Sequence, residues 1–337
     1  MLRAAIVGFG GIATSHRRAY AELEKEGKIK LVAAYDVDPA AFTKRVAINI
    51  GTNTDFKENI NHYTSLDEML EKEEIDLVDV CAPTYVHREL TVDILRRGYH
   101  VMCEKPMSLS YADCLAMIEA ARESGKQLMI GQCVRFYPAY DYVKEAIETG
   151  KFGKFLGAAF RRLSVPPTWG YENWFMCPER SGGCLTDLHI HDVDLVRYLF
   201  GEPKAVSCST STSVCIHDTV HSSFYYDGAP ITAIGDWSLN GIPFNADSQI
   251  NFEKATVRVE MDELTVYPKD GTESYAVNTK MQHNAQFIEL SYFHDVIEGV
   301  IENKKNPPES AALTILLAEH LRRSADSNGE RVEFKAI

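Results

Sequence analysis

A glycine turn between two apolar runs, close to the start of the chain, constrains the fold most. A short apolar run ends in Gly8-Phe-Gly10-Gly-Ile-Ala13, and a second run, 29–35, ends at Asp36. This order of strand, glycine turn, helix and acid-tipped strand is typical of a dinucleotide-binding βαβ unit. Gly8 permits the tight turn, Gly10 lets a pyrophosphate approach the backbone, and the helix start offers free N–H groups. We therefore expect a nicotinamide dinucleotide to contact Gly8, Phe9, Gly10, Gly11 and Ile12.

Asp36 predicts which dinucleotide binds. A carboxylate at this position accepts hydrogen bonds from the adenosine ribose hydroxyls, as in NAD sites. The 2′-phosphate of NADP would meet a like charge, at a cost of roughly 4 kcal/mol per unit charge at about 4 Å and an effective dielectric near 20. Val37, Asp38 and Pro39 follow, so no adjacent cation offers that phosphate a partner. We expect NAD rather than NADP; the alternative interpretation of Asp36 is a solvated loop acid.

Charge and cysteine content narrow the class of protein. The 35 basic and 48 acidic residues give a net charge of -13, which argues against general binding of nucleic acid or of an anionic membrane. The eight cysteines form no CxxC pair or zinc-like spacing, so we expect buried free thiols and no metal. We find no leader peptide and no apolar stretch of 18 residues, and expect a cytoplasmic protein.

Strand-like and helix-like patterns alternate over the first 130 residues. Such alternation predicts a doubly wound α/β Rossmann sheet, parallel and covered by helices on both faces. Gly98 is expected to close one helix, and Ser65 to cap the start of another. The expected strands are residues 4–7, 31–35, 77–81, 100–103 and 128–132, and the expected helices are residues 13–26, 39–46, 65–71, 86–97 and 110–124.

The pattern changes after residue 133. Strands there follow one another directly, which predicts an α+β region with a large, mostly antiparallel open sheet. We place the domain boundary there, giving a dinucleotide-binding domain, 1–133, and a substrate-binding and oligomerisation domain, 134–337. The expected strands of the second domain are residues 155–163, 205–214, 219–226, 231–239, 248–251, 255–261 and 263–267, and the expected helices are residues 139–148, 186–200, 285–301 and 310–327.

Two turns follow strands of the first domain at the sheet edge where doubly wound folds bind ligands. In the turn 81–87, we expect Ala82, Pro83, Thr84 and His87 to contact the cofactor; the alternative is an ordinary turn with a capping histidine. The second turn is Glu104-Lys105-Pro106, also expected near the nicotinamide. An ammonium there can bind a substrate hydroxyl and stabilise a developing alkoxide. The alternative is a surface ion pair.

A third motif runs from Gly182 to Asp194. Asp187 and His191 are four residues apart, so on a single helix they share one face. A carboxylate beside an imidazole raises its basicity and fixes its tautomer, which suits proton abstraction from an alcohol. One alternative is a metal site that uses His189, His191 and acidic residues. Another is a helix start with a hydrogen-bonded core histidine.

Together with Arg135-Phe-x-Pro138, these motifs resemble the Gfo/Idh/MocA family, named for glucose-fructose oxidoreductase, inositol dehydrogenase and rhizopine catabolism proteins. The resemblance spans nearly the whole chain. It implies that Lys105 contacts substrate and nicotinamide and that Asp187 and His191 are the catalytic pair. It also implies a homodimer or homotetramer formed through the C-terminal sheet. One departure is His189, where glycine is usual, which raises the question of an extra imidazole near the pocket.

The expected activity is NAD-dependent oxidation of a secondary hydroxyl in a sugar, cyclitol or related polyol. His191 would accept the hydroxyl proton, Lys105 would hold the oxygen, and Asp187 would orient His191. The alternatives are a glycoside hydrolase that retains its NAD and a dinucleotide-binding sensor without catalysis. Beyond the catalytic groups, which also contact substrate, we expect substrate contacts from Arg135, Arg161 and Trp174.

Overall fold

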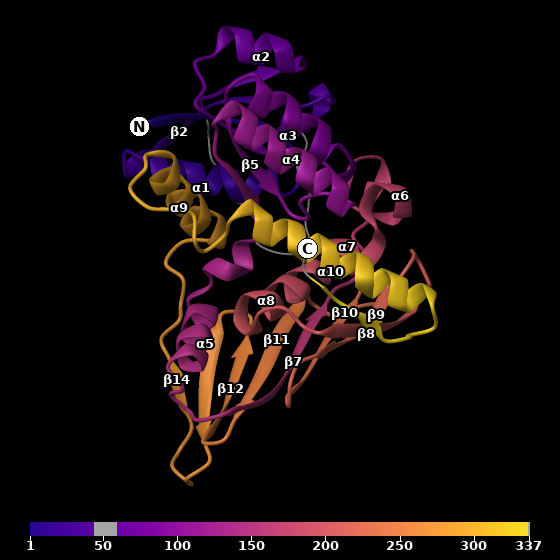
Figure 1. Cartoon of the computed structure of the whole chain (residues 1–337). Coiled ribbons are helices and arrows are strands. Elements are labelled where there is room, and N and C mark those ends of the chain that lie inside the picture. Colours follow the sequence, from indigo (N-terminus) through magenta and orange to yellow (C-terminus); the bar gives the residue numbers. More distant parts are fainter. Residues whose placement is uncertain (44–58, 336–337) are drawn as a thin grey trace.

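Two β-sheets organise the computed structural model, which describes residues 1–43 and 59–335 (Figure 1). The first sheet has six parallel strands in the order β3-β2-β1-β4-β5-β6. Successive strands are added toward one edge from β1 to β3 and toward the other edge from β4 to β6. This is the strand order of a Rossmann fold, as predicted. Its strands are β1 (Leu2–Val7), β2 (Ile29–Tyr35), β3 (Asn61–Tyr63), β4 (Leu77–Val80), β5 (His100–Glu104) and β6 (Leu128–Gly131).

Two helices of this Rossmann region begin at a serine cap, as expected at Ser65. The hydroxyl of Ser65 accepts the N–H of Glu68 at 3.3 Å, and Ser110 caps the next-but-one helix in the same way. The expected helix 39–46 is instead a short 3-10 segment, η1 (Pro39–Phe42), and residues 44–46 lie outside the described part of the chain. The other segments are α1 (Ala13–Lys25), α2 (Leu66–Lys72), η2 (Thr84–Val86), α3 (His87–Arg96) and α4 (Tyr111–Ser124).

The second region contains a nine-stranded sheet in the order β14-β13-β12-β11-β7-β10-β9-β8-β15. Every neighbouring pair is antiparallel except β7 and β10, so the prediction of a mostly antiparallel sheet is confirmed. Its strands are β7 (Phe155–Leu163), β8 (Ala205–Ser211), β9 (Thr219–Tyr225), β10 (Pro230–Asp236), β11 (Asn245–Phe252), β12 (Ala255–Glu260), β13 (Glu263–Pro268), β14 (Tyr275–Val277) and β15 (Val332–Glu333).

Helices cover one face of the second sheet and connect it to the Rossmann region (Figure 1). Helix α8 contacts β7 and β10, and α10 contacts both β8 and the Rossmann helix α4. Among the described residues, every helix is too short or too polar to cross a membrane. The segments are η3 (Cys133–Phe136), α5 (Pro138–Glu148), η4 (Tyr171–Met176), α6 (Pro178–Ser181), α7 (Gly183–Asp187), α8 (Ile190–Phe200), α9 (Ala285–Ile297) and α10 (Pro308–Asp326).

Helix α9 lies late in the sequence but packs in the Rossmann region. It contacts α1, and Phe287, Leu290 and Phe293 belong to the same apolar cluster as Ile6 and Leu23. The boundary between residues 133 and 134 therefore stays a prediction. The structure adds that helix α9, which lies beyond this boundary in sequence, packs back against the first domain.

Candidate active site

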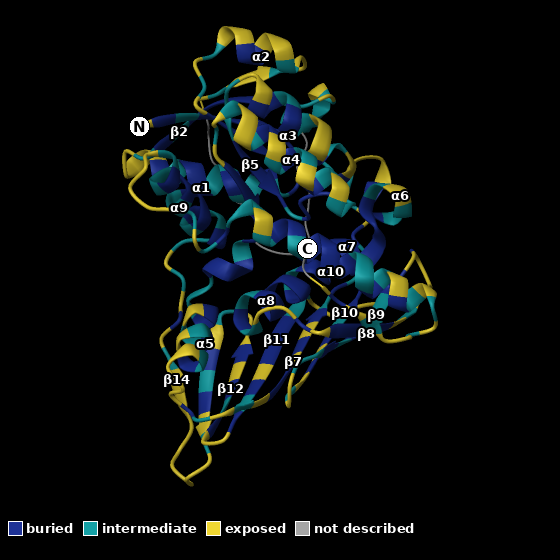
Figure 2. Ribbon diagram, viewed as in Figure 1, coloured by how far each residue is buried: buried dark blue, intermediate teal, exposed yellow. Residues whose placement is uncertain are grey.

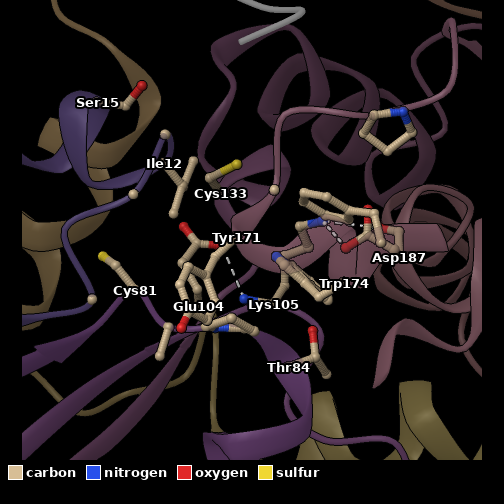
Figure 3. A pocket seen from close by; sticks show the side chains of 18 of the residues that line it. Ile12, Ser15, Cys81, Thr84, Glu104, Lys105, Cys133, Tyr171, Trp174 and Asp187 are labelled. Carbon is tan, nitrogen blue, oxygen red and sulfur yellow. Dashed lines mark hydrogen bonds and ion pairs between the residues drawn. The ribbon is translucent and has the colours of Figure 1, made fainter. Parts of the chain in front are cut away.

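A cavity of about 1190 Å³ lies between the Rossmann region and the second sheet (Figure 3). It is larger than the roughly 300–1,000 Å³ of a typical pocket for one small ligand. Its wall combines the ends of β1, β2, β4 and β5 with α7, α8 and the loop before η4. The predicted site residues that line it are Gly8, Phe9, Gly10, Gly11, Ile12, Asp36, Ala82, Pro83, Thr84, Glu104, Lys105, Trp174, Asp187 and His191.

The glycine turn has the shape that a pyrophosphate needs. Gly8 has a φ of +93°, and a Cβ there would lie 2.7 Å from the backbone nitrogen of Ala82, so the two strand ends can approach only at glycine. A Cβ on Gly10 would meet no atom within 4 Å. The backbone at Gly10 therefore has the free space beside it that a bound phosphate group requires, and the residues present fit a dinucleotide.

Asp36 joins the end of β2 to this turn. Its Oδ2 accepts the N–H of Phe9 at 2.7 Å, and its Oδ1 accepts the N–H of Asp38 at 2.9 Å. Each carboxylate oxygen has further lone pairs for ribose hydroxyls. The carboxylate is thus held at the cavity wall by backbone donors.

The turn after β4 differs in one respect from the prediction. Ala82, Pro83 and Thr84 line the cavity, but His87 does not. The imidazole of His87 is buried, with ring nitrogens 2.9 and 2.8 Å from the carbonyl oxygens of Pro106 and Ala82. His87 therefore connects the two turns beneath the cavity, and its assignment to the cofactor is corrected.

Lys105 and Asp187 meet across the cavity from opposite regions, as Figure 3 shows. The Lys105 Nζ donates to the carbonyl oxygen of Asp187 at 2.9 Å and lies 3.4 Å from its Oδ1. The backbone N–H of Lys105 donates to Glu104 Oε2 at 3.0 Å. Burial raises the pKa of the Asp187 carboxyl, and the nearby Lys105 charge opposes that rise.

The expected pairing of Asp187 with His191 is not present. Helix α7 ends at Asp187 and α8 begins at Ile190, so the helix predicted over residues 186–200 is interrupted. These two described residues both line the cavity, but their side chains form no hydrogen bond with each other. Among the described residues, the buried Nδ1 of His191 has no hydrogen-bond partner. Burial, with the charges of Lys105 and Arg162, holds the pKa of His191 well below its usual value. His191 is therefore a neutral imidazole at physiological pH.

Two predicted substrate residues are used elsewhere. Arg135 is 1% exposed, does not line the cavity, and donates from Nε and Nη2 to Asp194 at 2.7 and 2.5 Å. Arg161 also lies outside the cavity wall and pairs with Asp247 at 2.9 Å. Side chains alternate along β7, so Arg162 is the one that lines the cavity.

Arg162 is a site residue that sequence reasoning missed. Its guanidinium donates from Nε and Nη2 to Asp192, at 3.1 and 2.9 Å. The two-residue period of the strand was the signal that distinguishes it from Arg161. Several apolar and aromatic lining residues were also missed because they come from segments far apart in sequence: Tyr137, Tyr140, Trp237, Phe244, Met261 and Met281.

The aromatic loop before α6 serves both the cavity and the packing beneath it. Trp169, Tyr171 and Trp174 all line the cavity, and the ring of Trp174 stacks on Phe175 with centroids 3.9 Å apart. Trp174 is buried, so contact with a sugar and packing are compatible roles for it.

His189 is a core residue and not an extra imidazole at the pocket. It is fully buried, does not line the cavity, and its Nε2 lies 2.8 Å from Ser222 Oγ. Burial lowers the pKa of His189 to about 3. The space for it is provided by Gly235 on β10, where a Cβ would lie 2.9 Å from the His189 side chain.

The metal alternative with His189 and His191 is not supported among the described residues. The one group there with metal-ligand side chains is His16, Asp79 and Cys81. The Nδ1 of His16 lies 2.7 Å from Asp79 Oδ2, which is a hydrogen-bond distance.

Family models match both parts of the chain. Residues 2–132 match the model described as the oxidoreductase family, NAD-binding Rossmann fold, and residues 140–258 match the GFO/IDH/MocA C-terminal domain. The chain is 35% identical over 145 residues to 2,7-anhydro-N-acetylneuraminate hydratase of Escherichia coli. That alignment covers 43% of this chain and 39% of the hydratase. It is 31% identical over 202 residues to myo-inositol 2-dehydrogenase of Thermotoga maritima, covering 60% and 55% of the two chains.

The chain thus spans only 39% and 55% of the lengths of these two curated relatives. The fold extends over the whole length: a levoglucosan dehydrogenase solved with NADH and levoglucosan superposes with a TM-score of 0.82, at 19% identity and full coverage of both chains. The two family models, the strand order and the glycine turn agree. The chain belongs to the Gfo/Idh/MocA family of oxidoreductases.

Proposed function

We propose that this protein is an NAD-dependent dehydrogenase that oxidises a secondary hydroxyl of a sugar, cyclitol or related polyol. One observation carries the proposal: Lys105, Asp187 and His191 line the same cavity as the glycine turn and Asp36. Bound NAD would take the hydride from the carbinol carbon. A reacting hydroxyl in this cavity would lie within reach of both an ammonium and a neutral imidazole.

His191 is the general base in this proposal. Its lowered pKa keeps the imidazole unprotonated at neutral pH, so it can accept the hydroxyl proton. Among the described residues its Nδ1 has no protein partner. The ammonium of Lys105 would hold the substrate oxygen and stabilise the negative charge that develops as the proton leaves.

Asp187 has a different role here from the one its spacing predicts. Its carbonyl and carboxylate both contact the Lys105 ammonium. We assign it the task of holding that ammonium over the cavity, so that Lys105 and His191 approach the same hydroxyl. The loop aromatics Trp169, Tyr171 and Trp174 would contact the sugar ring.

The decisive experiment measures NADH and product together. Purified protein, NAD and a panel of sugars and cyclitols are expected to give one NADH for each molecule of ketone formed. Conversion of a glycoside without accumulation of NADH would support the alternative of a hydrolase that retains its cofactor. Tight NADH binding with no conversion of any substrate would support the sensor.

We also propose a cytoplasmic homodimer or homotetramer that associates through the nine-stranded sheet. The sheet leaves large apolar side chains exposed on its strands, including Leu156, Tyr267 and Tyr275. Light scattering coupled to size exclusion would give the number of subunits, and Tyr267→Glu on the sheet is expected to shift it toward the monomer. A monomeric wild-type protein would refute the proposal.

A further inference from the structure

A buried ionic cluster lies beneath the cavity and plays no part in the proposed chemistry described so far. His16 on α1 is fully buried and does not line the cavity. Its Nδ1 lies 2.7 Å from Asp79 Oδ2, and its Nε2 lies 2.8 Å from Glu104 Oε1. Ionised carboxylates only accept hydrogen bonds, so an imidazole that bonds to both must donate from both nitrogens. The cluster therefore holds His16 as an imidazolium between two carboxylates.

The electrostatics of the cluster agree with this protonation state. Burial lowers the pKa of His16, but the interactions with Asp79 and, secondarily, with Cys81 together outweigh burial and hold that pKa well above the usual value. Burial raises the pKa of Glu104, and the hydrogen bond and charge of His16, together with the charge and backbone N–H of Lys105, more than reverse that rise. The imidazolium is thus the largest of the influences that keep Glu104 ionised inside the protein.

Glu104 connects this cluster to the catalytic lysine. One carboxylate oxygen of Glu104 bonds to His16, and the other accepts the backbone N–H of Lys105 at 3.0 Å. Both oxygens are therefore engaged by protein donors, and Glu104, although it lies at the cavity wall, acts within the protein. The series Asp79, His16, Glu104 and Lys105 runs from β4 through α1 to the end of β5.

We propose that His16 is a positioning residue: it ties the helix that follows the glycine turn to Glu104, and so fixes the backbone from which Lys105 reaches the reacting hydroxyl. Helix α1 carries both the dinucleotide turn at its start and His16 one turn later. The cofactor side and the catalytic lysine are thereby linked by hydrogen bonds through one imidazolium. This inference rests on the proposed dehydrogenase function.

The cluster offers a matched pair of variants. In His16→Gln the side chain keeps a polar amide but loses the positive charge and one of the two bonds. In Tyr20→Phe the hydroxyl that donates to Asp79 Oδ2 at 2.9 Å is lost, and the contacts of Glu104 remain. A purely structural role predicts similar loss of activity for equal losses of stability in the two variants.

A positioning role predicts a difference between them. In His16→Gln, kcat should fall about 10- to 100-fold, since small misplacement of a catalytic group has effects of that order. The KM for the polyol and the Kd for NADH should change by less than about threefold, because the binding surfaces are intact. In Tyr20→Phe, kcat should stay within about twofold of wild type.

The pH dependence of kcat is a measurement that a loss of stability alone would not change. Without the imidazolium, burial raises the pKa of Glu104 against the remaining charge and N–H of Lys105, so kcat of the variant should fall off at a higher pH than kcat of the wild type. Wild-type His16 should also show two protonated ring nitrogens by ¹⁵N NMR at pH 7.5. The other titratable groups that interact with this cluster are Tyr20, Cys81, His87, Cys103, Lys105, Cys133, Asp187 and Glu289.

Each outcome decides the inference. A reduced kcat together with a pH profile shifted to higher pH in His16→Gln alone supports it. Equal kcat in both variants, or a neutral His16 in the wild type, overturns it. The NMR measurement keeps the test available if His16→Gln does not fold. Failure of the proposed function is separate: a wild-type protein that oxidises no polyol refutes that function, and the NMR spectrum still reports the protonation of His16.

Discussion

The two walls of the cavity differ in the chemistry that they present. On the Rossmann side, Asp36 and Glu104 each accept two hydrogen bonds from protein donors. On the opposite wall, Asp187 contacts the ammonium of Lys105. Among the described residues that line the cavity, His191 on this second wall is the one histidine. The first wall therefore presents carboxylates fixed by protein donors, and the second adds a side chain suited to proton transfer.

The two sheets that carry these walls differ in how completely their strands are buried. Strands β4 and β6 are buried at every position, because helices cover both faces of the Rossmann sheet. Along β12, buried and more exposed residues alternate, because one face of the second sheet is uncovered (Figure 2). The Rossmann wall stands on the more completely buried support.

The largest expected effect would test the wall that carries the base. His191→Ala should lower kcat by about 10²- to 10⁴-fold, the usual contribution of a general base, while NADH binding persists. Steady-state kinetics and NADH fluorescence titration measure the two quantities. His221→Ala is the matched control, because that imidazole is exposed on β9 and outside the cavity wall. Unchanged turnover in His191→Ala would remove His191 from its role and abolish the contrast between the walls.

A stability comparison would sharpen the contrast between buried and exposed arginines. Arg135→Met should lower the free energy of unfolding by about 3–5 kcal/mol, because it leaves Asp194 charged and buried without its partner. Arg161→Ala, whose side chain is 48% exposed, should cost no more than about 1 kcal/mol. Urea denaturation measures both. Equal costs would show that burial does not separate the two ion pairs.

Asp36→Asn should break the selectivity of the cofactor wall. Removing the negative charge is expected to reduce the preference for NAD over NADP about 10- to 100-fold. This change is smaller than the ~4 kcal/mol upper limit for one unit charge, because the site is partly solvated. The ratio of kcat/KM for the two cofactors measures it. Asp38→Asn, which lies two residues on and also lines the cavity, is the control and should leave the ratio nearly unchanged.

The smallest expected effect concerns the core behind the substrate wall. The pKa of His189 is lowered to about 3, so the native protein keeps it neutral while the unfolded chain takes up a proton below pH 6.5. Stability is therefore lost as pH falls, by about 1.6 kcal/mol between pH 6.5 and pH 5 for this group. His189→Gln should reduce this dependence, measured by urea denaturation at the two pH values. A dependence that is unchanged in the variant would show that His189 titrates normally.

Sequence reasoning succeeded where the signal is local. The turn at Gly8 and the acid at Asp36 belong to one βαβ unit, and both lie at the cavity wall. The strand β3 (Asn61–Tyr63) was missed, because two of its three residues are exposed polar side chains and no apolar run marks it. The cofactor half of the site is thus nearly readable from neighbouring residues.

The substrate half depends on contacts between distant segments. The position of His189 is explained by Gly235, 46 residues later, which no local pattern indicates. The partner of Asp187 is Lys105, which comes from the other region of the chain. Spacing placed Asp187 and His191 on one helix, but the regular helical hydrogen bonding is interrupted between them. Only the assembled fold shows which basic side chain Asp187 contacts.

The return of α9 to the Rossmann region has a practical consequence for dissecting the molecule. Phe287, Leu290 and Phe293 cover apolar surface formed by residues near the beginning of the chain. A fragment cut after residue 133 would leave that surface bare and invite self-association. Expressed alone, the fragment 1–133 would aggregate, and supplying α9 as a separate peptide should restore its solubility.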